Sequence, residues 1–333
     1  MHGWLILDKP VGIGSTQAVS AVKRALRAGG YAKVKVGHGG TLDPLASGVL
    51  PVALGEATKL AGRMLDASKA YDFEITFGVE TDTLDAEGKP VRSSDVRPTR
   101  AAIEAILPRF TGPIDQVPPA FSALKVDGER AYDLARAGEE VTLASRRVTV
   151  HALHILPGTG RGTAGEAGGG GGAEPDAAPT ADPLRQPFGL PPPRSGEELG
   201  AVTLAAEVSK GTYIRSLARD IAHALGTVGH VTLLRRTRAG PFGLDQAITL
   251  DKLADLGQRR ALEEVLLPLR AGLDGIPALS LSPGQAEALR QGRVLTGIAA
   301  ANGLHFAQAG NLPVALVEVS AGAVRVVRGF NLT

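Results

Sequence analysis

Cysteine is absent from all 333 residues of the sequence. This absence excludes disulfides, thiolate zinc sites, iron–sulfur clusters and cysteine nucleophiles together. Aromatic residues make up only 4% of the chain, so leucine, valine, isoleucine and alanine must fill the core. No apolar run is long enough to span a membrane, and the apolar stretch 4–7 has no basic residues before it, as a signal peptide would. These absences predict a soluble, cytoplasmic protein of about two domains.

Common catalytic and cofactor motifs are missing as well. The sequence has no Walker A motif, no Gly-x-Ser-x-Gly and no His-Glu-x-x-His. His151 and His154 are three residues apart on an expected strand, so they point to opposite faces and suit no shared metal ion. Residues 160–165 fit Gly-x-Gly-x-x-Gly, but no helix follows, which makes the match a coincidence of composition. We therefore expect no metal and no cofactor.

Residues 157–200 differ from the rest of the chain. Glycine and proline dominate this segment, and its large apolar residues are few. Such a composition buries too little surface to offset the entropy cost of ordering. The sequence predicts a disordered insertion between two strands.

Periodicity predicts the main elements on both sides of that insertion. Helical spacing follows Ser15-Thr16, which would cap the helix, and recurs over 214–225. Alternation over 71–77 predicts a half-buried strand, and 231–238 is strand-like with a basic cluster formed by Arg235, Arg236 and Arg238. From about residue 272 the pattern indicates a small, mostly β module. The formal net charge of +2 permits nucleic-acid binding without demanding it.

Residues 37–48 (GHGGTLDPLASG) are the segment in which polar side chains are most densely interspersed with glycines. Asp43 precedes Pro44 there, so it either caps a short helix or is an exposed functional carboxylate. His38 lies between two glycines, whose lack of side chains leaves nothing to enclose it as a core residue. A backbone with so few side chains around it favours the close approach of a ligand.

Two later sites are ambiguous when taken by themselves. Tyr71 shares a strand face with three apolar residues, which favours core packing. Tyr213 and Arg215 stand where a strand meets a helix, and an arginine there is more often a solvated charge or a local ion pair.

Taken together, these segments resemble the TruB family of tRNA pseudouridine synthases. The resemblance rests on 37–48, on 68–71 (SKAY) and on 209–215 (SKGTYIR), supported by 7–10 (LDKP) and 55–59 (GEATK) in the same order and spacing. It covers most of residues 3–155 and 201–270. It implies isomerisation of the uridine at position 55 in the TΨC arm of tRNA to pseudouridine, without cofactor.

The resemblance also implies the site residues. Asp43 would be the catalytic nucleophile, acting at C1′ or by an elimination route. The other implied residues are His38 filling the vacated base stack, Tyr71 stacking on the flipped base, Arg215 pairing with the catalytic aspartate, Tyr213 and Leu234 in the pocket wall, and Lys9 and Lys59 binding the RNA. The implied catalytic set is therefore Asp43, Tyr71 and Arg215.

The implied fold is α+β, a mixed and largely antiparallel sheet flanked by helices. Residues 1–271 would form the catalytic domain, with an RNA-clamping insertion at 117–147, and 272–333 a PUA-like RNA-binding module. We expect a monomer that binds tRNA without an obligate protein partner or membrane. Two alternatives stay open: a non-catalytic RNA-binding protein on the same scaffold, and a pseudouridine synthase for a different RNA. Retention of Asp43, Tyr71 and Arg215 argues against the first.

Overall fold

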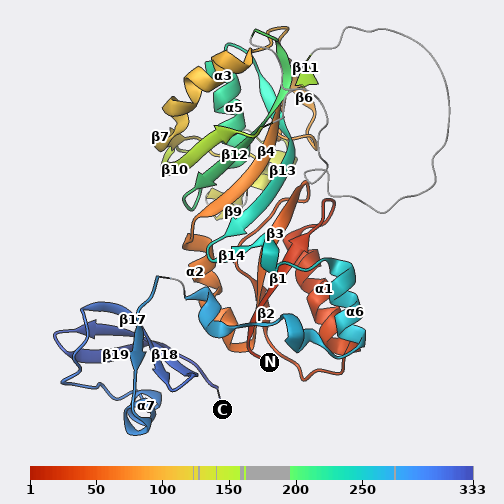
Figure 1. Cartoon of the computed structure of the whole chain (residues 1–333). Coiled ribbons are helices and arrows are strands. Elements are labelled where there is room, and N and C mark those ends of the chain that lie inside the picture. Colours follow the sequence, from red (N-terminus) through yellow and green to blue (C-terminus); the bar gives the residue numbers. More distant parts are fainter. Residues whose placement is uncertain are drawn as a thin grey trace. The chain divides into compact units, whose positions relative to one another are not determined.

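The computed structural model describes residues 1–122, 124–126, 128–139, 141–157, 161–162, 196–273 and 275–332. The chain divides into two compact units, which are Met1–Lys69 with Arg236–Thr333, and Ala70–Arg235. The architecture is α+β with a mixed, largely antiparallel sheet and flanking helices, as the resemblance implied (Figure 1). The strand β13 (Gly229–Ala239) contributes residues to both units.

The first unit is built on strands in the order β15-β1-β3-β13, with β2 beside β3 and β14 beside β13. Their bounds are β1 (Gly3–Lys9), β2 (Val36–His38), β3 (Ala46–Leu54), β14 (Phe242–Gly243) and β15 (Leu267–Pro268). β1 runs antiparallel to β3, with Gly3 opposite Leu54 and Lys9 opposite Gly48. Nearly every side chain of β1 and β3 is buried, which explains their continuous apolar sequences.

Helices cover this part of the sheet. α1 (Ser15–Ala28) and α6 (Leu250–Gln258) lie side by side, packed closely where Gly257 meets Ala25 (Figure 1). The shorter helical pieces are η1 (Gly55–Leu60), α2 (Ala61–Asp66), η3 (Leu244–Gln246), η4 (Leu262–Val265) and η5 (Leu269–Gly272). The predicted capping role of Ser15 is wrong, because α1 begins at that residue and Gly14 is the cap.

The second unit has the strand order β13-β4-β12-β10-β7, with β11 beside β12. Its strands are β4 (Lys69–Phe77), β5 (Val79–Thr81), β6 (Pro90–Ser93), β7 (Gly112–Gln116), β10 (Arg146–Ile155), β11 (Arg161–Gly162) and β12 (Leu199–Val208). Its main helices are α3 (Arg100–Ile106), continued by η2 (Leu107–Phe110), and α5 (Ile214–Ala224). β10 is antiparallel to both β12 and β7, and β5 and β6 form a separate hairpin.

The strand and helix predicted by periodicity in this unit are confirmed. On β4, Phe73, Ile75 and Phe77 are buried and alternate with half-buried polar residues. α5 buries Leu217, Ile221 and their neighbours, and ends before Gly226, whose φ is +73°.

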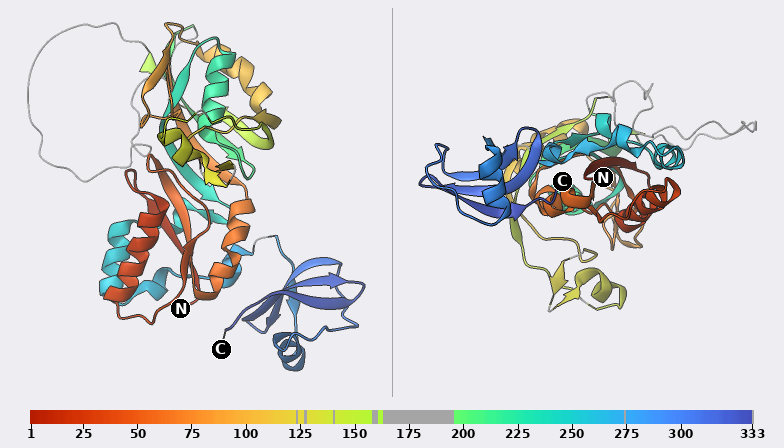
Figure 2. Two further views of the ribbon diagram at one scale, coloured as in Figure 1. Left: turned by 180° about the vertical axis from the view of Figure 1, so that it is seen from behind. Right: turned by 90° about the horizontal axis from the view of Figure 1, so that it is seen from below.

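The predicted insertion 117–147 holds a short hairpin, β8 (Lys125–Val126) and β9 (Glu129–Arg130), followed by α4 (Ala131–Arg136) (Figure 2). Most of the predicted disordered insertion 157–200 lies outside the described residues. Its described parts show that β12 begins at Leu199 and pairs with Arg161–Gly162, so the strand starts earlier than the sequence indicated.

The C-terminal residues form the β-rich module that the sequence predicted. Four strands in the order β16-β17-β18-β19 pack against α7, and they have bounds β16 (Ala278–Ser280), α7 (Pro283–Arg290), β17 (Gly303–Ala309), β18 (Leu312–Ser320) and β19 (Ala323–Gly329). Ser282 caps α7 through Gln285 N. Phe306 and Phe330 of this module share a core cluster with Trp4 and Leu269, so the module packs within the first unit. A domain boundary at 271/272 stays a prediction.

Candidate active site

Asp43 lies in the loop between β2 and β3. The loop closes in a turn in which Ala46 N–H donates to Asp43 O at 3.1 Å, and β3 starts at that alanine. No helix follows Asp43, so the interpretation as a helix cap is wrong. The side chain is half-buried, on a segment whose neighbours Thr41 and Pro44 are exposed. The structure thus presents a carboxylate on a surface loop.

Two side chains from other elements hold this loop. The Ser15 hydroxyl accepts from Leu42 N at 2.8 Å and donates to Leu42 O at 3.1 Å. Arg236 Nη1 donates to Thr41 O at 3.2 Å. Thr41 and Leu42 are the two residues before Asp43 in the chain. The sequence analysis missed both roles, because it took Ser15 as a helix cap and Arg236 as part of a basic cluster.

His38 ends β2, where it pairs with Val52 of β3. Its ring is half-buried, and Nδ1 has no hydrogen-bond partner among the described residues. Burial lowers the pKa of His38, the positive charge of Arg236 lowers it further, and the backbone at Gly40 acts in the opposite direction. Its surroundings therefore favour the neutral imidazole over the charged form.

The two lysines assigned to RNA have partners within the protein. Lys9 is fully buried, and its Nζ donates to Pro10 O at 2.9 Å and Ile13 O at 2.7 Å. Lys59 Nζ lies 2.7 Å from Glu56 Oε2 and donates to Gly329 O at 2.9 Å. Their contribution to RNA binding stays a prediction.

Arg215 is buried in the second unit, in the first turn of α5. Its Nη1 donates to Thr83 O at 2.8 Å and lies 3.3 Å from Asp85 Oδ2, and its Nη2 donates to Phe121 O at 3.0 Å. Arg215 is thus not a solvated charge, and its ion pair is with an aspartate distant in sequence. The implied pairing of Arg215 with Asp43 stays a prediction.

Asp85 is a residue that sequence reasoning missed, because it lies in none of the motifs that carry the resemblance. Only 3% of it is exposed. Leu84, immediately before it, has a φ of +62°, which is uncommon for a residue other than glycine. The Asp85 carboxylate also accepts from Thr83 Oγ1 at 2.5 Å and Glu87 N at 3.1 Å, which fixes it for Arg215.

Tyr213 precedes α5 and is held by Gln116. The Gln116 side chain accepts from Tyr213 N at 2.8 Å and donates to Tyr213 O at 3.1 Å. Arg146 places its guanidinium 4.8 Å from the centre of the Tyr213 ring and bonds to Gly211 O. Neither Gln116 nor Arg146 was singled out for this position, since each is remote in sequence.

Tyr71 and Leu234 lie on strands of the second unit. Tyr71 is half-buried on β4, in contrast to the buried Phe73 two residues on. Leu234 is 8% exposed on β13. The Tyr71 ring is less enclosed than the core residues on the same face of β4, so part of its surface is available for stacking.

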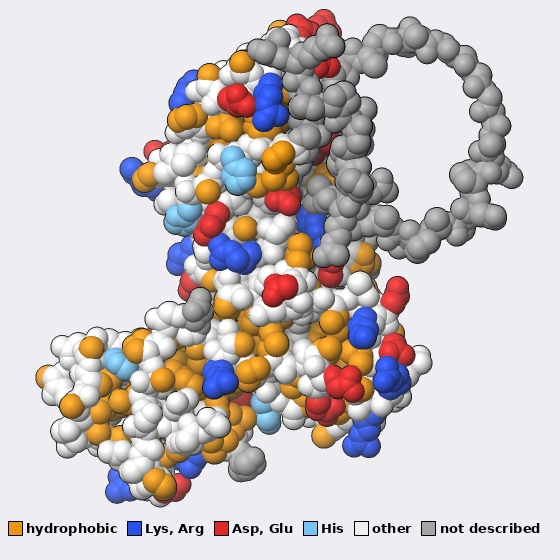
Figure 3. All heavy atoms as spheres, viewed as in Figure 1, with side chains coloured by type: hydrophobic (Ala, Val, Ile, Leu, Met, Phe, Trp, Pro, Cys, Tyr) orange, Lys and Arg blue, Asp and Glu red, His pale blue; other side chains and the backbone are white. Residues whose placement is uncertain are grey.

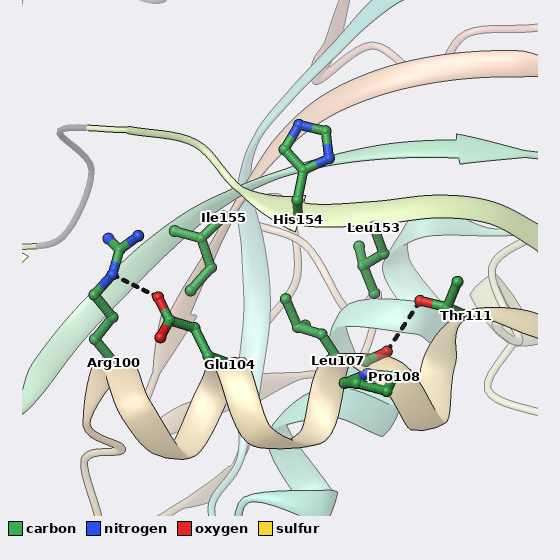
Figure 4. A pocket seen from close by; sticks show the side chains of 8 residues that line it. All are labelled: Arg100, Glu104, Leu107, Pro108, Thr111, Leu153, His154 and Ile155. Atoms are coloured by element: carbon green, nitrogen blue, oxygen red, sulfur yellow. Dashed lines mark hydrogen bonds and ion pairs between the residues drawn. The ribbon is translucent and has the colours of Figure 1, made fainter.

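A shallow pocket in the second unit has an apolar floor between the α3–η2 helix and β10, with an Arg100–Glu104 ion pair at its rim, but no predicted site residue lines it (Figure 4). Basic and acidic side chains are interspersed on the face drawn in Figure 3. Among the described residues, no three His, Asp or Glu side chains gather as metal ligands. In that same part of the chain, every helix is too short or too polar to cross a bilayer.

Known proteins match this chain over its whole length. The N-terminal domain model of TruB family pseudouridylate synthases matches residues 23–164, and the C-terminal domain model of tRNA pseudouridylate synthase B matches 215–274. The chain is 60% identical to tRNA pseudouridine synthase B of Novosphingobium aromaticivorans, covering 100% of this chain and 98% of that protein. Identity to the protein of the same name in Zymomonas mobilis is 53%, with 99% and 96% covered.

Solved structures agree in fold. A chain of a Cbf5-Nop10-Gar1 complex superposes with a TM-score of 0.67 at 26% identity, covering 99% of this chain and 85% of that one. A chain of an H/ACA RNP bound to a substrate RNA containing 2′-deoxyuridine gives a TM-score of 0.66 at 24% identity, with the same coverage. The fold and the matching family models define an RNA-modifying isomerase of the pseudouridine synthase class. The chain belongs to the TruB family of pseudouridylate synthases.

Proposed function

We propose that this enzyme converts the uridine at position 55 in the TΨC arm of tRNA to pseudouridine, with Asp43 as the catalytic carboxylate. The observation that carries the proposal is the half-exposed Asp43 on a loop held at Thr41 and Leu42, in a chain 60% identical to a tRNA pseudouridine synthase B. The high identity to these tRNA enzymes favours tRNA over another RNA as substrate.

The reaction breaks the bond from ribose C1′ to uracil N1 and forms a bond from C1′ to C5. N1 gains a proton and C5 loses one, so the reaction needs no oxidant, reductant or energy source. The target base must leave its stack, which costs a few kcal/mol. We assign His38 to fill the vacated place, and Tyr71 to stack on the flipped uracil, a contact of about 1–3 kcal/mol in single-strand recognition.

Charges near the reacting ribose would be supplied by Asp43 and Arg215. Arg215 is immobilised by Asp85 and two carbonyl groups, which is the preorganisation that charge stabilisation requires. Tyr213 and Leu234 would form the apolar wall that excludes water. One carboxylate can suffice because uracil leaves as a delocalised anion and stays bound until it rejoins.

The test is Asp43→Asn. A neutral amide preserves the shape of the loop but cannot act as a nucleophile, so we expect pseudouridine formation to disappear while tRNA affinity falls much less. Asp95→Asn, at an exposed carboxylate after β6, is the matched control. Turnover of Asp43→Asn within about tenfold of wild type would overturn the assignment.

The substrate is tested in cells. Pseudouridine mapping of total RNA from a strain lacking this protein should show loss at position 55 of tRNA, restored by wild type and not by Asp43→Asn. If the strain lacking this protein keeps pseudouridine at position 55 of tRNA but loses it at a position in another RNA, that other RNA is the substrate.

A further inference from the structure

Arg236 is the most deeply buried member of the basic cluster formed by Arg235, Arg236 and Arg238. Only 1% of it is exposed, against 5% of Arg235, and it lies on the part of β13 that belongs to the first unit. Removing a guanidinium from water is costly unless several acceptors replace the water. The partners of this side chain therefore indicate why it is there.

Arg236 bonds to both ends of the segment that carries Asp43. Nε donates to Val49 O of β3 at 2.7 Å, and Nη1 donates to Thr41 O in the loop at 3.2 Å. A single rigid guanidinium thus fixes the start of the loop relative to the strand that follows it. The planar fork of donors makes arginine suited to bridging two carbonyls, which the single ammonium of lysine does less well.

One glycine leaves the space that this arrangement needs. A Cβ at Gly48, whose φ is +99°, would collide with the backbone of Arg236. A side chain at this position would therefore force β3 and the strand that carries Arg236 apart. The last glycine of the 37–48 motif thus serves the close approach of Arg236.

Stability alone does not explain this arginine. Its Nη2 is buried and has no acceptor among the described residues. An unpaired buried donor costs free energy, and an apolar residue of similar volume often replaces a buried charge without loss. The residue therefore contributes to the geometry of the loop more than to the free energy of folding.

We propose that Arg236 is a positioning residue for Asp43. It holds Thr41, Ser15 holds Leu42, and the carboxylate that follows them is kept in one place when RNA binds. The proposal rests on the function assigned to Asp43 above. It also explains why the basic cluster need not face RNA at this position.

The experiment compares Arg236→Met with Arg238→Met. Arg238 is on the same strand, is half-buried and donates to Gly240 O at 3.1 Å, outside the Asp43 loop. With saturating tRNA we expect the single-turnover rate of Arg236→Met to fall about 100-fold, because small misplacements of a reacting group have effects of that size. The tRNA dissociation constant and the melting temperature should stay near those of Arg238→Met.

A conservative variant and a readout without RNA complete the test. Arg236→Lys can reach one carbonyl, so its rate should lie between those of wild type and Arg236→Met. Hydrogen exchange of the amides at 39–43 should accelerate in Arg236→Met and stay unchanged in Arg238→Met. Unchanged exchange, an unchanged rate, or a rate loss that only follows the melting temperature would overturn the proposal. Activity of the Asp43→Asn variant would instead overturn the proposed function, independently of the results for the Arg236 variants.

Discussion

The two charged groups of the proposed chemistry, Asp43 and Arg215, are fixed in different ways. Asp43 stands on a loop of the first unit, and side chains from α1 and β13 hold the main chain of Thr41 and Leu42 before it. Arg215 stands in a helix of the second unit, and it is held through its own guanidinium by Asp85 and two carbonyls.

The difference follows from the length and exposure of the two side chains. An aspartate has a short side chain with two rotatable bonds, so fixing the backbone beside it confines its carboxylate to a few rotamers, and the carboxylate can stay open to substrate. An arginine has a long and flexible side chain, so it must be held at the guanidinium. We therefore expect mutations around Asp43 to act through the backbone, and mutations around Arg215 to act through charge.

The largest effect is expected for Arg215→Met. The change leaves Asp85 buried without its guanidinium, which should destabilise the protein by about 3–5 kcal/mol. Turnover should fall as well, because the group assigned to stabilise charge is lost. Urea unfolding and single-turnover assays measure the two losses. Adding Asp85→Asn should recover stability without recovering turnover, and recovery of both would show that Arg215 is structural.

Tyr71→Phe separates chemistry from packing within the second unit. Phenylalanine keeps the stacking face and loses only the hydroxyl. If the hydroxyl takes part in proton movement, the single-turnover rate should collapse while tRNA binding stays near normal. Tyr71→Leu, which also removes the stacking ring, should lower both the rate and the affinity. A near-normal rate for Tyr71→Phe would show that the hydroxyl takes no part in the chemistry and that Tyr71 serves core packing.

Ser15→Ala tests the backbone side of the comparison. It removes the partner of both Leu42 N–H and Leu42 O, so we expect a loss of about 1–3 kcal/mol if the donor stays buried, and a slower rate with unchanged affinity. Ser20→Ala is the matched control, because Ser20 is on the same helix and its hydroxyl donates to Thr16 O of that helix at 3.0 Å. Equal rates for the two variants would show that the Leu42 contacts do not position Asp43.

The smallest effect concerns Asp72, next to Tyr71 on β4. Burial raises the pKa of its carboxyl above the ordinary 3.8, although the charges of Arg235 and His154 act in the opposite direction. The folded state then binds more protons than the unfolded state, so stability falls as the pH rises above 3.8. Asp72→Asn should raise the melting temperature at pH 7 by about 1–3 °C. The gain should shrink as the pH is lowered, and a gain independent of pH would contradict this origin.

Much of the fold could be predicted because periodicity and caps are local signals. The strand over 71–77 and the helix after Tyr213 both follow from residues adjacent in sequence. The resemblance marked Asp43 and Arg215 through long motifs. The cap at Ser15 was wrong because a serine hydroxyl can bond equally well to its own helix or to a distant loop, and sequence does not distinguish these.

The sequence by itself therefore determined the family, the order of the elements and the loop on which Asp43 stands. Tertiary structure decided which polar residues support them. Asp85 and Gln116 lie outside the motifs of the resemblance, and Arg236 looked like one charge in a basic cluster. Each is buried and bonded to backbone or charge far along the chain. Burial depends on which distant segments pack together, and that information is present in no single stretch of the sequence.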